Sequence, residues 1–199
     1  MTGPDATAPA ARGVSIRALD AAEAGARLGE LSDILVDAVA HGASLNFLAG
    51  FTREEGRAFW RGQLPAIAGG ATRLLVGEDG GRLVGTVLLF FAHQPNAPHR
   101  AEVGKMLVLS SHRRRGLGSR LLAAAEATAR GAGRTLLILD TETGSAGEAL
   151  YRRCGWTALG GITALGGIPD HSYTTDGRLA EATVFLKALG PHRRPAAGG

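Results

Sequence analysis

The sequence predicts an α/β domain with a mixed, mostly antiparallel central sheet, one parallel strand pair and flanking helices. Residues 103–109 form a nearly continuous apolar run, as expected of a strand covered on both faces. From Gly116 onward, apolar residues recur at three- and four-residue steps, which is typical of an amphipathic helix. Residues 134–140 are a second predicted buried strand, with an apolar run at 136–139. Because a helix connects the two runs, they should pair as parallel strands with a right-handed crossover.

A basic, glycine-containing turn lies between the first of these strands and the helix. Residues 113–118 combine three arginines with Gly116 and Gly118. Glycine lets the backbone approach a ligand closely, and a helix N-terminus presents unpaired N–H groups and the positive end of its dipole. Arginine adds charge-assisted donors suited to phosphate. The turn therefore predicts a binding site for an anion about the size of a pyrophosphate.

Composition limits the class of protein. At 199 residues the chain is long enough for one domain with a sizeable core, which we place at residues 14–189. A charged fraction of 20% and a hydrophobic fraction of 45% are ordinary for a globular protein. The formal net charge of +4 fits an anionic cofactor and is too small and clustered to indicate a nucleic-acid partner.

Other classes are disfavoured by what the sequence lacks. The single Cys154 excludes an intramolecular disulfide and a cysteine-based zinc site, and the spacing of the histidines suggests no other metal site. No apolar run approaches a membrane span, and the N-terminus has no signal-peptide pattern. We therefore expect a cytoplasmic protein without a membrane partner. Residues 1–13 and 190–199 are expected to be disordered tails.

The remaining elements follow in chain order. Asp20 is expected to cap a helix that runs to about Ala40, and residues 52–55 form a capping box for a second helix, which Pro65 and Gly69 bring to a close. The alternation of apolar residues and a tight-turn signal at 78–81 predict further strands. These strands span residues 14–19, 72–77, 82–91 and 182–187.

The connection between the two N-terminal helices carries unusually apolar residues for a loop. It is bounded by Gly42 and Gly50, and its composition fits either a packed lid or part of a substrate pocket. His41, Ser44 and Asn46 are its polar members, each of which also suits a turn or cap role. We take Ser44, Asn46 and Phe47 as candidate substrate-binding residues.

The turn and helix resemble motif A of the GCN5-related N-acetyltransferases (GNAT), whose signature is Gln/Arg-x-x-Gly-x-Gly/Ala. Arg113, Gly116 and Gly118 match it. Leu150-Tyr151 followed by Gly155-Trp156 resembles motif B of the same family. The resemblance implies the GNAT fold, in which the two parallel strands splay apart and acetyl-CoA enters the gap. By this resemblance the cofactor-binding residues are Met106, Leu107, Val108, Arg113, Arg114, Arg115, Gly116, Leu117, Gly118 and Ser119.

A narrower resemblance is to the tabtoxin resistance protein branch, whose enzymes acetylate a toxic β-lactam amino acid. It rests on short matches at residues 42–44, 95–96, 100–105, 139–145 and 176–179. The chain departs from the pattern in two places. Gly144 stands where the family often has an Asn, and Leu-Gly-Gly-Ile occurs twice within residues 159–168 near the expected substrate entrance.

Acetyl transfer needs a proton acceptor for the amine, stabilisation of a tetrahedral oxyanion, and a proton for the leaving thiolate. Tyr151 is the candidate acid through its motif B match. Glu102 and Asp140 are both candidates for the base, and the residues leave that choice open. The resemblance implies backbone N–H groups around Leu107 and Val108 as oxyanion donors. Lys105 is expected to be solvated or ion-paired.

The function indicated by the resemblance is acetyl-CoA-dependent N-acetylation of a primary amine on a small molecule, such as an amino-acid-like antibiotic or toxin. Direct transfer through a tetrahedral intermediate is the expected mechanism. One alternative is acetylation of a protein N-terminus or lysine. An alternative of another class is a non-catalytic CoA-binding sensor. The expected partner is therefore a small-molecule amine, and edge strands leave homodimerisation open.

Overall fold

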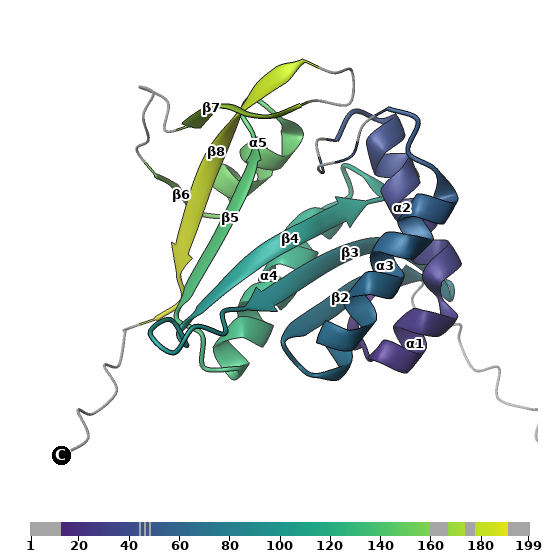
Figure 1. Cartoon of the computed structure of the whole chain (residues 1–199), viewed down its shortest axis with the longest axis horizontal. Coiled ribbons are helices and arrows are strands. Elements are labelled where there is room, and N and C mark those ends of the chain that lie inside the picture. Colours follow the sequence, from purple (N-terminus) through teal and green to yellow (C-terminus); the bar gives the residue numbers. More distant parts are fainter. Residues whose placement is uncertain are drawn as a thin grey trace, which may run out of the picture.

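The sheet is continuous and mixed, and helices cover both of its faces (Figure 1). A computed structural model describes residues 13–43, 45, 47, 49–159, 167–173 and 178–190. Of residues 167–173 it describes the backbone alone, which forms a strand. The strand order is β1-β2-β3-β4-β5-β8-β6, with β7 paired to β8. The strands are β1 (Ser15–Leu19), β2 (Thr72–Asp79), β3 (Arg82–Phe91), β4 (Arg100–Val108), β5 (Leu136–Glu142), β6 (Thr157–Ala158), β7 (Gly167–Tyr173) and β8 (Leu179–Ala188).

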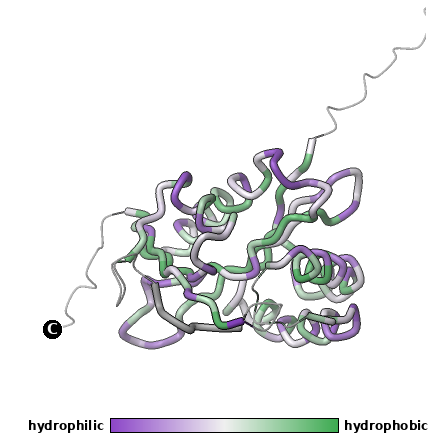
Figure 2. Tube along the Cα trace, turned by 90° about the horizontal axis from the view of Figure 1, so that it is seen from above, coloured by the Kyte–Doolittle hydropathy of each residue, from purple (hydrophilic) through white to green (hydrophobic). Residues whose placement is uncertain are grey.

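Two hydrophobic cores lie on opposite faces of the sheet. One face packs against α1 (Ala21–Ala26), α2 (Leu28–Ala40) and α3 (Arg53–Ala68), around the fully buried Trp60. The other packs against α4 (Leu117–Gly131) and α5 (Ala146–Arg153). Because helices cover both faces of the sheet, its central strands are predominantly hydrophobic, as the colouring of Figure 2 shows.

The predicted parallel pair is present, and it separates along its length. β4 and β5 pair only from Arg100 opposite Leu136 to Glu102 opposite Ile138. Beyond that point β4 continues beside β3, whereas β5 stays paired to β8 as far as Glu142. The two strands therefore diverge toward their carboxyl ends, as Figure 1 shows, and the mixed fold with a splayed pair is confirmed.

The single helix expected from Asp20 to Ala40 is instead two helices, which is a correction. Asp20 forms the predicted cap, a capping box with Glu23, but the helix breaks at Arg27 (φ −112°, ψ 20°). The Arg27 guanidinium donates to Glu30 at 2.8 Å, to Glu78 at 3.1 Å and to the Gly81 carbonyl at 2.6 Å. Glu78 and Gly81 belong to the β2–β3 hairpin, so the helix break at Arg27 coincides with a tertiary contact to that hairpin.

The second predicted helix begins as expected and runs further than expected. Thr52 and Glu55 form the capping box. Pro65 does not end α3, which continues to Ala68, and the Gly69 amide donates to the Pro65 carbonyl at 2.9 Å. Proline lacks one amide donor, but its fixed φ is compatible with a helix. Within the described residues, no helix is long and apolar enough to span a membrane.

Candidate active site

The three predicted catalytic residues come from the two strands that border the β4–β5 gap and from the helix that follows β5. Glu102 is the last residue of β4 that pairs with β5, opposite Ile138. Asp140 lies two residues beyond Ile138, so strand alternation places its side chain on the same face as Glu102. Tyr151 comes from α5, the helix that follows β5. The start of α4 follows the carboxyl end of β4, where open α/β sheets bind ligands.

The start of α4 has the properties expected of an anion site. Gly116 is its N-cap with φ 77°, and no described side chain caps the helix, so its first amides have no side-chain acceptor. A Cβ atom at Gly116 would meet nothing within 4 Å, so the glycine faces open space. At Gly118, a Cβ atom would lie 3.1 Å from Leu150 Cδ2, which shows how closely α4 and α5 approach there. These residues fit a bound pyrophosphate.

The three arginines of the turn differ in their surroundings. Arg113 is bound to the protein: its Nε donates to the Val108 carbonyl at 3.0 Å, and its Nη2 lies 3.7 Å from Asp37 Oδ2. Arg114 (φ 62°) and Arg115 are exposed beside the helix start. Arg113 therefore braces the turn, while the other two remain available for an anionic ligand.

The electrostatics of the two carboxylates are coupled. Desolvation raises the pKa of Glu102 above its ordinary value, although the residue keeps an exposed surface, and the Asp140 carboxylate raises this pKa further. Lys105 and Arg100 act in the opposite direction on the same pKa. The site thus holds one carboxyl group whose affinity for a proton is increased.

Tyr151 is buried, with 7% of its surface exposed. Its ring centroid lies 5.9 Å from that of Trp156 and 5.8 Å from that of Phe185. Burial raises the pKa of the Tyr151 phenol above its ordinary value, and the charges of Asp140 and Cys154 raise it further. The phenol therefore stays protonated at neutral pH.

A β-bulge in β4 turns Lys105 toward the same face as Glu102, which the sequence pattern does not reveal. The register to β3 shifts between Thr86 and Leu88, and Lys105 has φ 47°. A Cβ atom on Gly104 would lie 2.8 Å from Phe90, and Lys105 Nζ lies over the Phe59 ring of α3. Two consecutive residues thus face the α3 side. Burial lowers the pKa of Lys105, whereas the negative charges of Asp140 and Glu102 act in the opposite direction.

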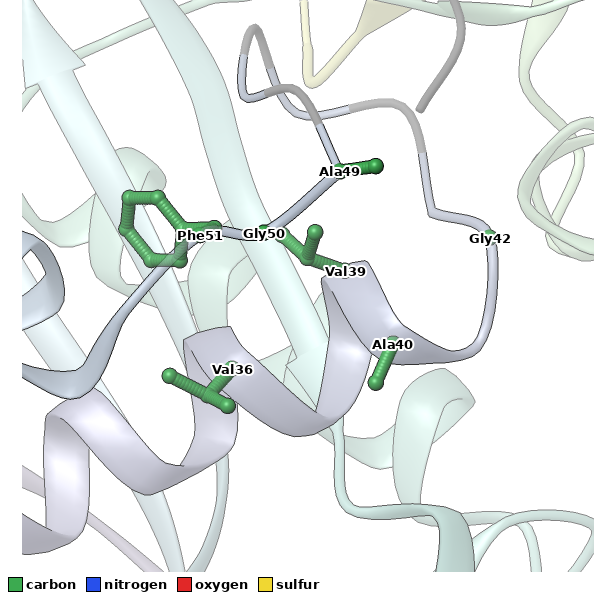
Figure 3. A pocket seen from close by; sticks show the side chains of 7 residues that line it. All are labelled: Val36, Val39, Ala40, Gly42, Ala49, Gly50 and Phe51. Carbon is green, nitrogen blue, oxygen red and sulfur yellow. The ribbon is translucent and has the colours of Figure 1, made fainter. Parts of the chain in front are cut away.

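Of the predicted substrate-binding residues, Phe47 can be placed, whereas Ser44 and Asn46 lie outside the described residues, as does most of the 159–168 repeat. The Phe47 ring packs 4.1 Å from that of Phe51 and 5.6 Å from that of Phe59. Its neighbour Phe51 also lines a hollow of about 460 Å³ between α2 and the segment that follows it (Figure 3). Its lining is apolar and consists of Val36, Val39, Ala40, Gly42, Ala49, Gly50 and Phe51.

Gly144, which stands where the family often has an Asn, shapes the start of α5. It adopts φ 78°, and its amide donates to Glu148 in the first turn of α5. The position therefore requires a left-handed backbone, which glycine adopts readily. Among the residues that the structure describes, no group of three or more His, Cys, Asp or Glu side chains could hold a metal ion.

Comparisons with known proteins agree with this fold. The model of the acetyltransferase (GNAT) family matches residues 36–156, more than half of the chain. A GNAT superfamily phosphinothricin acetyltransferase from Sinorhizobium meliloti, in complex with acetyl-CoA, superposes with a TM-score of 0.73 at 18% identity, covering 93% of this chain and 94% of the other.

Two further solved structures share the fold. A ribosomal-protein-alanine N-acetyltransferase from Brucella melitensis has a TM-score of 0.67 at 24% identity and covers 87% of this chain and 99% of its own. An N-acetyltransferase from Staphylococcus aureus Mu50 has a TM-score of 0.70 at 17% identity, with coverages of 89% and 99%. At these identities the similarity establishes the fold and leaves the acceptor to be inferred from the site.

Proposed function

The chain belongs to the acetyltransferase (GNAT) family, and on this premise we propose that it acetylates the primary amine of a small, amino-acid-like molecule. As a family member it is an acyltransferase, and its acetyl donor is acetyl-CoA. The observation that carries the proposal is the β4–β5 gap, which has an uncapped helix N-terminus and the buried phenol of α5 on one face of the sheet and two carboxyl groups on the other.

On the donor side, acetyl-CoA supplies a thioester whose acyl carbon accepts the amine. The amides at the start of α4, with Arg114 and Arg115 beside them, would hold the pyrophosphate. Met106, Leu107 and Val108 would face the rest of the donor along β4, and the amides near Leu107 and Val108 would stabilise the developing oxyanion. Arg113 and Ser110 would keep the turn in place, since both bond to neighbouring elements.

On the acceptor side, the raised pKa of Glu102 favours this residue as the base. A carboxylate with a higher pKa takes a proton from an ammonium group more readily. Asp140, which contributes to that shift, would attract the ammonium group into the gap. As the N–C bond forms and the C–S bond breaks, the Tyr151 phenol would give its proton to the departing sulfur.

A small acceptor is supported by the apolar surroundings of the gap. Phe47 packs against Phe51 and Phe59, and Phe51 also lines the apolar hollow on α2; apolar and aromatic walls of this kind suit a compact ligand. The sequence resemblance to the tabtoxin resistance branch supports an amino-acid-like amine, and the phosphinothricin acetyltransferase among the similar structures is in line with that branch. Detoxification of an antibiotic or toxin is the role that such an acceptor would imply.

The test is a thiol-release assay with acetyl-CoA and a panel of amino acids, β-lactam amino acids, aminoglycosides, polyamines and short peptides. We expect selective turnover of small amino-acid-like amines. Tyr151→Phe should lower kcat by about 10²-fold, the usual contribution of a general acid, without weakening acetyl-CoA binding.

Other outcomes would assign another function. Turnover of peptides alone would make the protein a peptide or protein acetyltransferase. Acetyl-CoA binding with no turnover of any amine would indicate a CoA-binding sensor and overturn the catalytic assignments. An unchanged kcat in Tyr151→Phe would show that Tyr151 is not the acid. It would not affect the assignment of the acceptor class.

A further inference from the structure

Lys105 is the residue at the gap that the proposed chemistry does not use. It is half-buried in the middle of β4, and its backbone is left-handed with φ 47°. Residues other than glycine rarely adopt this conformation, and such an outlier persists only where its surroundings hold it. Its contacts therefore indicate what the bulge is for.

The Lys105 ammonium group is held by residues from the α2–α3 connection and from α3. Its Nζ donates to the Leu45 carbonyl at 3.1 Å. The same atom lies 5.4 Å from the ring centroid of Phe47 and 5.4 Å from that of Phe59, within the range of cation–π attraction. The two rings also contact each other edge-on at 5.6 Å. One cation thus joins β4, the connection and α3.

The same ammonium group faces the catalytic carboxylates electrostatically. The negative charges of Asp140 and Glu102 favour its charged form, against the burial that disfavours it. Without the bulge, strand alternation would direct Lys105 with Val103 toward the α4 face. The left-handed backbone is therefore what brings the cation to the acceptor side of the sheet.

We propose that Lys105 is a positioning residue, whose ammonium group fastens the acceptor-side segment, defined as Leu45, Phe47 and residues 49–51, beside the acceptor end of the gap. It acts by placing the aromatic wall of the acceptor site and does not touch the reacting atoms. Figure 1 shows the connection between α2 and α3 lying at the open end of the β4–β5 divergence. The assignment of this segment to the acceptor site rests on the proposed function, whereas the fastening itself does not.

The fastening is tested by amide hydrogen exchange on the full-length protein, with no ligand. In Lys105→Met, peptides covering residues 42–51 should exchange about tenfold faster than in the wild type, because a hydrogen bond and two cation–π contacts are lost. Peptides from α4 should be unchanged. Lys105→Arg, which keeps the charge, should stay near the wild type.

Two controls separate this role from a merely structural one. Lys105→Gly suits the left-handed backbone, so equal loss of protection in the Gly and Met variants would assign the effect to the side chain. Lys187→Met removes the chain's other lysine, which pairs with Glu126 at 2.8 Å. It should lower stability without selectively speeding exchange at 42–51.

Kinetics then test the positioning of the acceptor. With the best small amine from the thiol-release panel, Lys105→Met should raise the acceptor KM by about tenfold, while the Kd of acetyl-CoA stays within about twofold. Unchanged exchange at 42–51 in both Lys105→Met and Lys105→Gly would overturn the proposal, as would an equal rise in acceptor KM in Lys187→Met. If the wild type acetylates no amine, the proposed function fails, and the exchange result still decides the role of Lys105.

Discussion

Asp37 on α2 binds Ser110, two residues beyond the end of β4, through both of its carboxylate oxygens. Oδ2 accepts a hydrogen bond from the Ser110 amide at 2.7 Å, and Oδ1 accepts one from the Ser110 hydroxyl at 2.6 Å. The Arg113 guanidinium lies 3.7 Å from the same carboxylate. A helix on the acceptor side of the sheet thereby fixes the first residues of the turn proposed to hold the donor.

Asp37→Asn should weaken acetyl-CoA binding. An amide offers one acceptor oxygen where the carboxylate offers two, so one of the Ser110 donors loses its partner and Arg113 loses its counter-charge. Hydrogen bonds to charged groups contribute about 1.5–3 kcal/mol, which corresponds to an increase in Kd of about tenfold or more in isothermal titration calorimetry.

The matched control is Asp33→Asn. Asp33 lies one turn earlier on α2 and pairs with Arg53 at 2.6 Å on the surface. Its loss removes the same charge from the same helix without touching the turn, and surface pairs contribute at most about 1 kcal/mol. If both variants weakened binding equally, the effect would come from the net charge of α2 and not from the Ser110 contact.

Gly116→Ala should impair both stability and donor binding. At φ 77° an alanine is strained by about 1–2 kcal/mol. Its Cβ atom would also enter the open space at the helix start, where a phosphate is proposed to lie. We expect a lower free energy of unfolding in urea denaturation and an acetyl-CoA Kd raised by at least about tenfold.

Gly133→Ala separates these two effects. Gly133 has φ 74°, with nothing within 4 Å of an added Cβ atom, and it follows the far end of α4. Gly133→Ala should therefore lower the free energy of unfolding by the same amount as Gly116→Ala, about 1–2 kcal/mol, with no change in the Kd of acetyl-CoA. Weaker binding in both variants would show that the strain itself, transmitted through α4, accounts for the loss.

The sequence predicts features that depend on local patterns. The strand–turn–helix around Gly116, the helix cap at Asp20, the capping box at Thr52 and the parallel pair all follow from short-range spacing. What it does not predict depends on distant partners. The helix break at Arg27 coincides with contacts to Glu78, 51 residues away.

The same limit applies to the candidate site. Asp37 contacts a residue 73 positions further along the chain, and no local pattern marks it. Lys105 lies in an apolar strand pattern, where strict alternation would place it on the opposite face. Its bulge becomes visible only once β3 is paired to β4. Motif matching finds the residues that we propose to face the donor, whereas the contacts that hold them in place come from the tertiary fold.

Glu126 offers a test of stability away from the site. Its carboxylate accepts hydrogen bonds from Trp156 Nε1 at 3.0 Å and from Lys187 Nζ at 2.8 Å, and 9% of its side chain is exposed. Glu126→Gln keeps an acceptor for Trp156 and leaves the Lys187 ammonium group without its counter-charge. We expect a loss of about 2 kcal/mol, measured as a fall in Tm of roughly 4–8 °C by calorimetry. An unchanged Tm would show that this pair contributes no net stability.

The pH dependence of the reaction should report Glu102. Its pKa is raised by desolvation first and by Asp140 second, so the acid limb of kcat/KM should have its midpoint above the ordinary value for a glutamate. Activity should rise as the pH rises through this midpoint, because the base acts when deprotonated. In Glu102→Gln the limb should disappear, with kcat/KM lower by about 10²-fold at neutral pH.

The same shift has a consequence for stability. A raised carboxyl pKa means that the folded state binds the proton more tightly than the unfolded state. The stabilisation is fully present below the unfolded-state pKa and is lost as the pH rises through the folded-state pKa. Glu102→Gln, which mimics the protonated form, should therefore have a higher Tm than the wild type at pH 7, and this difference should shrink as the pH is lowered.

Asp140→Asn should lower the pKa of Glu102, since removing the Asp140 charge removes one cause of its elevation. The acid limb should persist in this variant and move to lower pH, while Glu102→Gln abolishes it. Should the limb vanish in Asp140→Asn and survive in Glu102→Gln, the roles are reversed: Asp140 is the base, and Glu102 holds the ammonium group. A limb unchanged in both variants would place the essential base elsewhere in the gap.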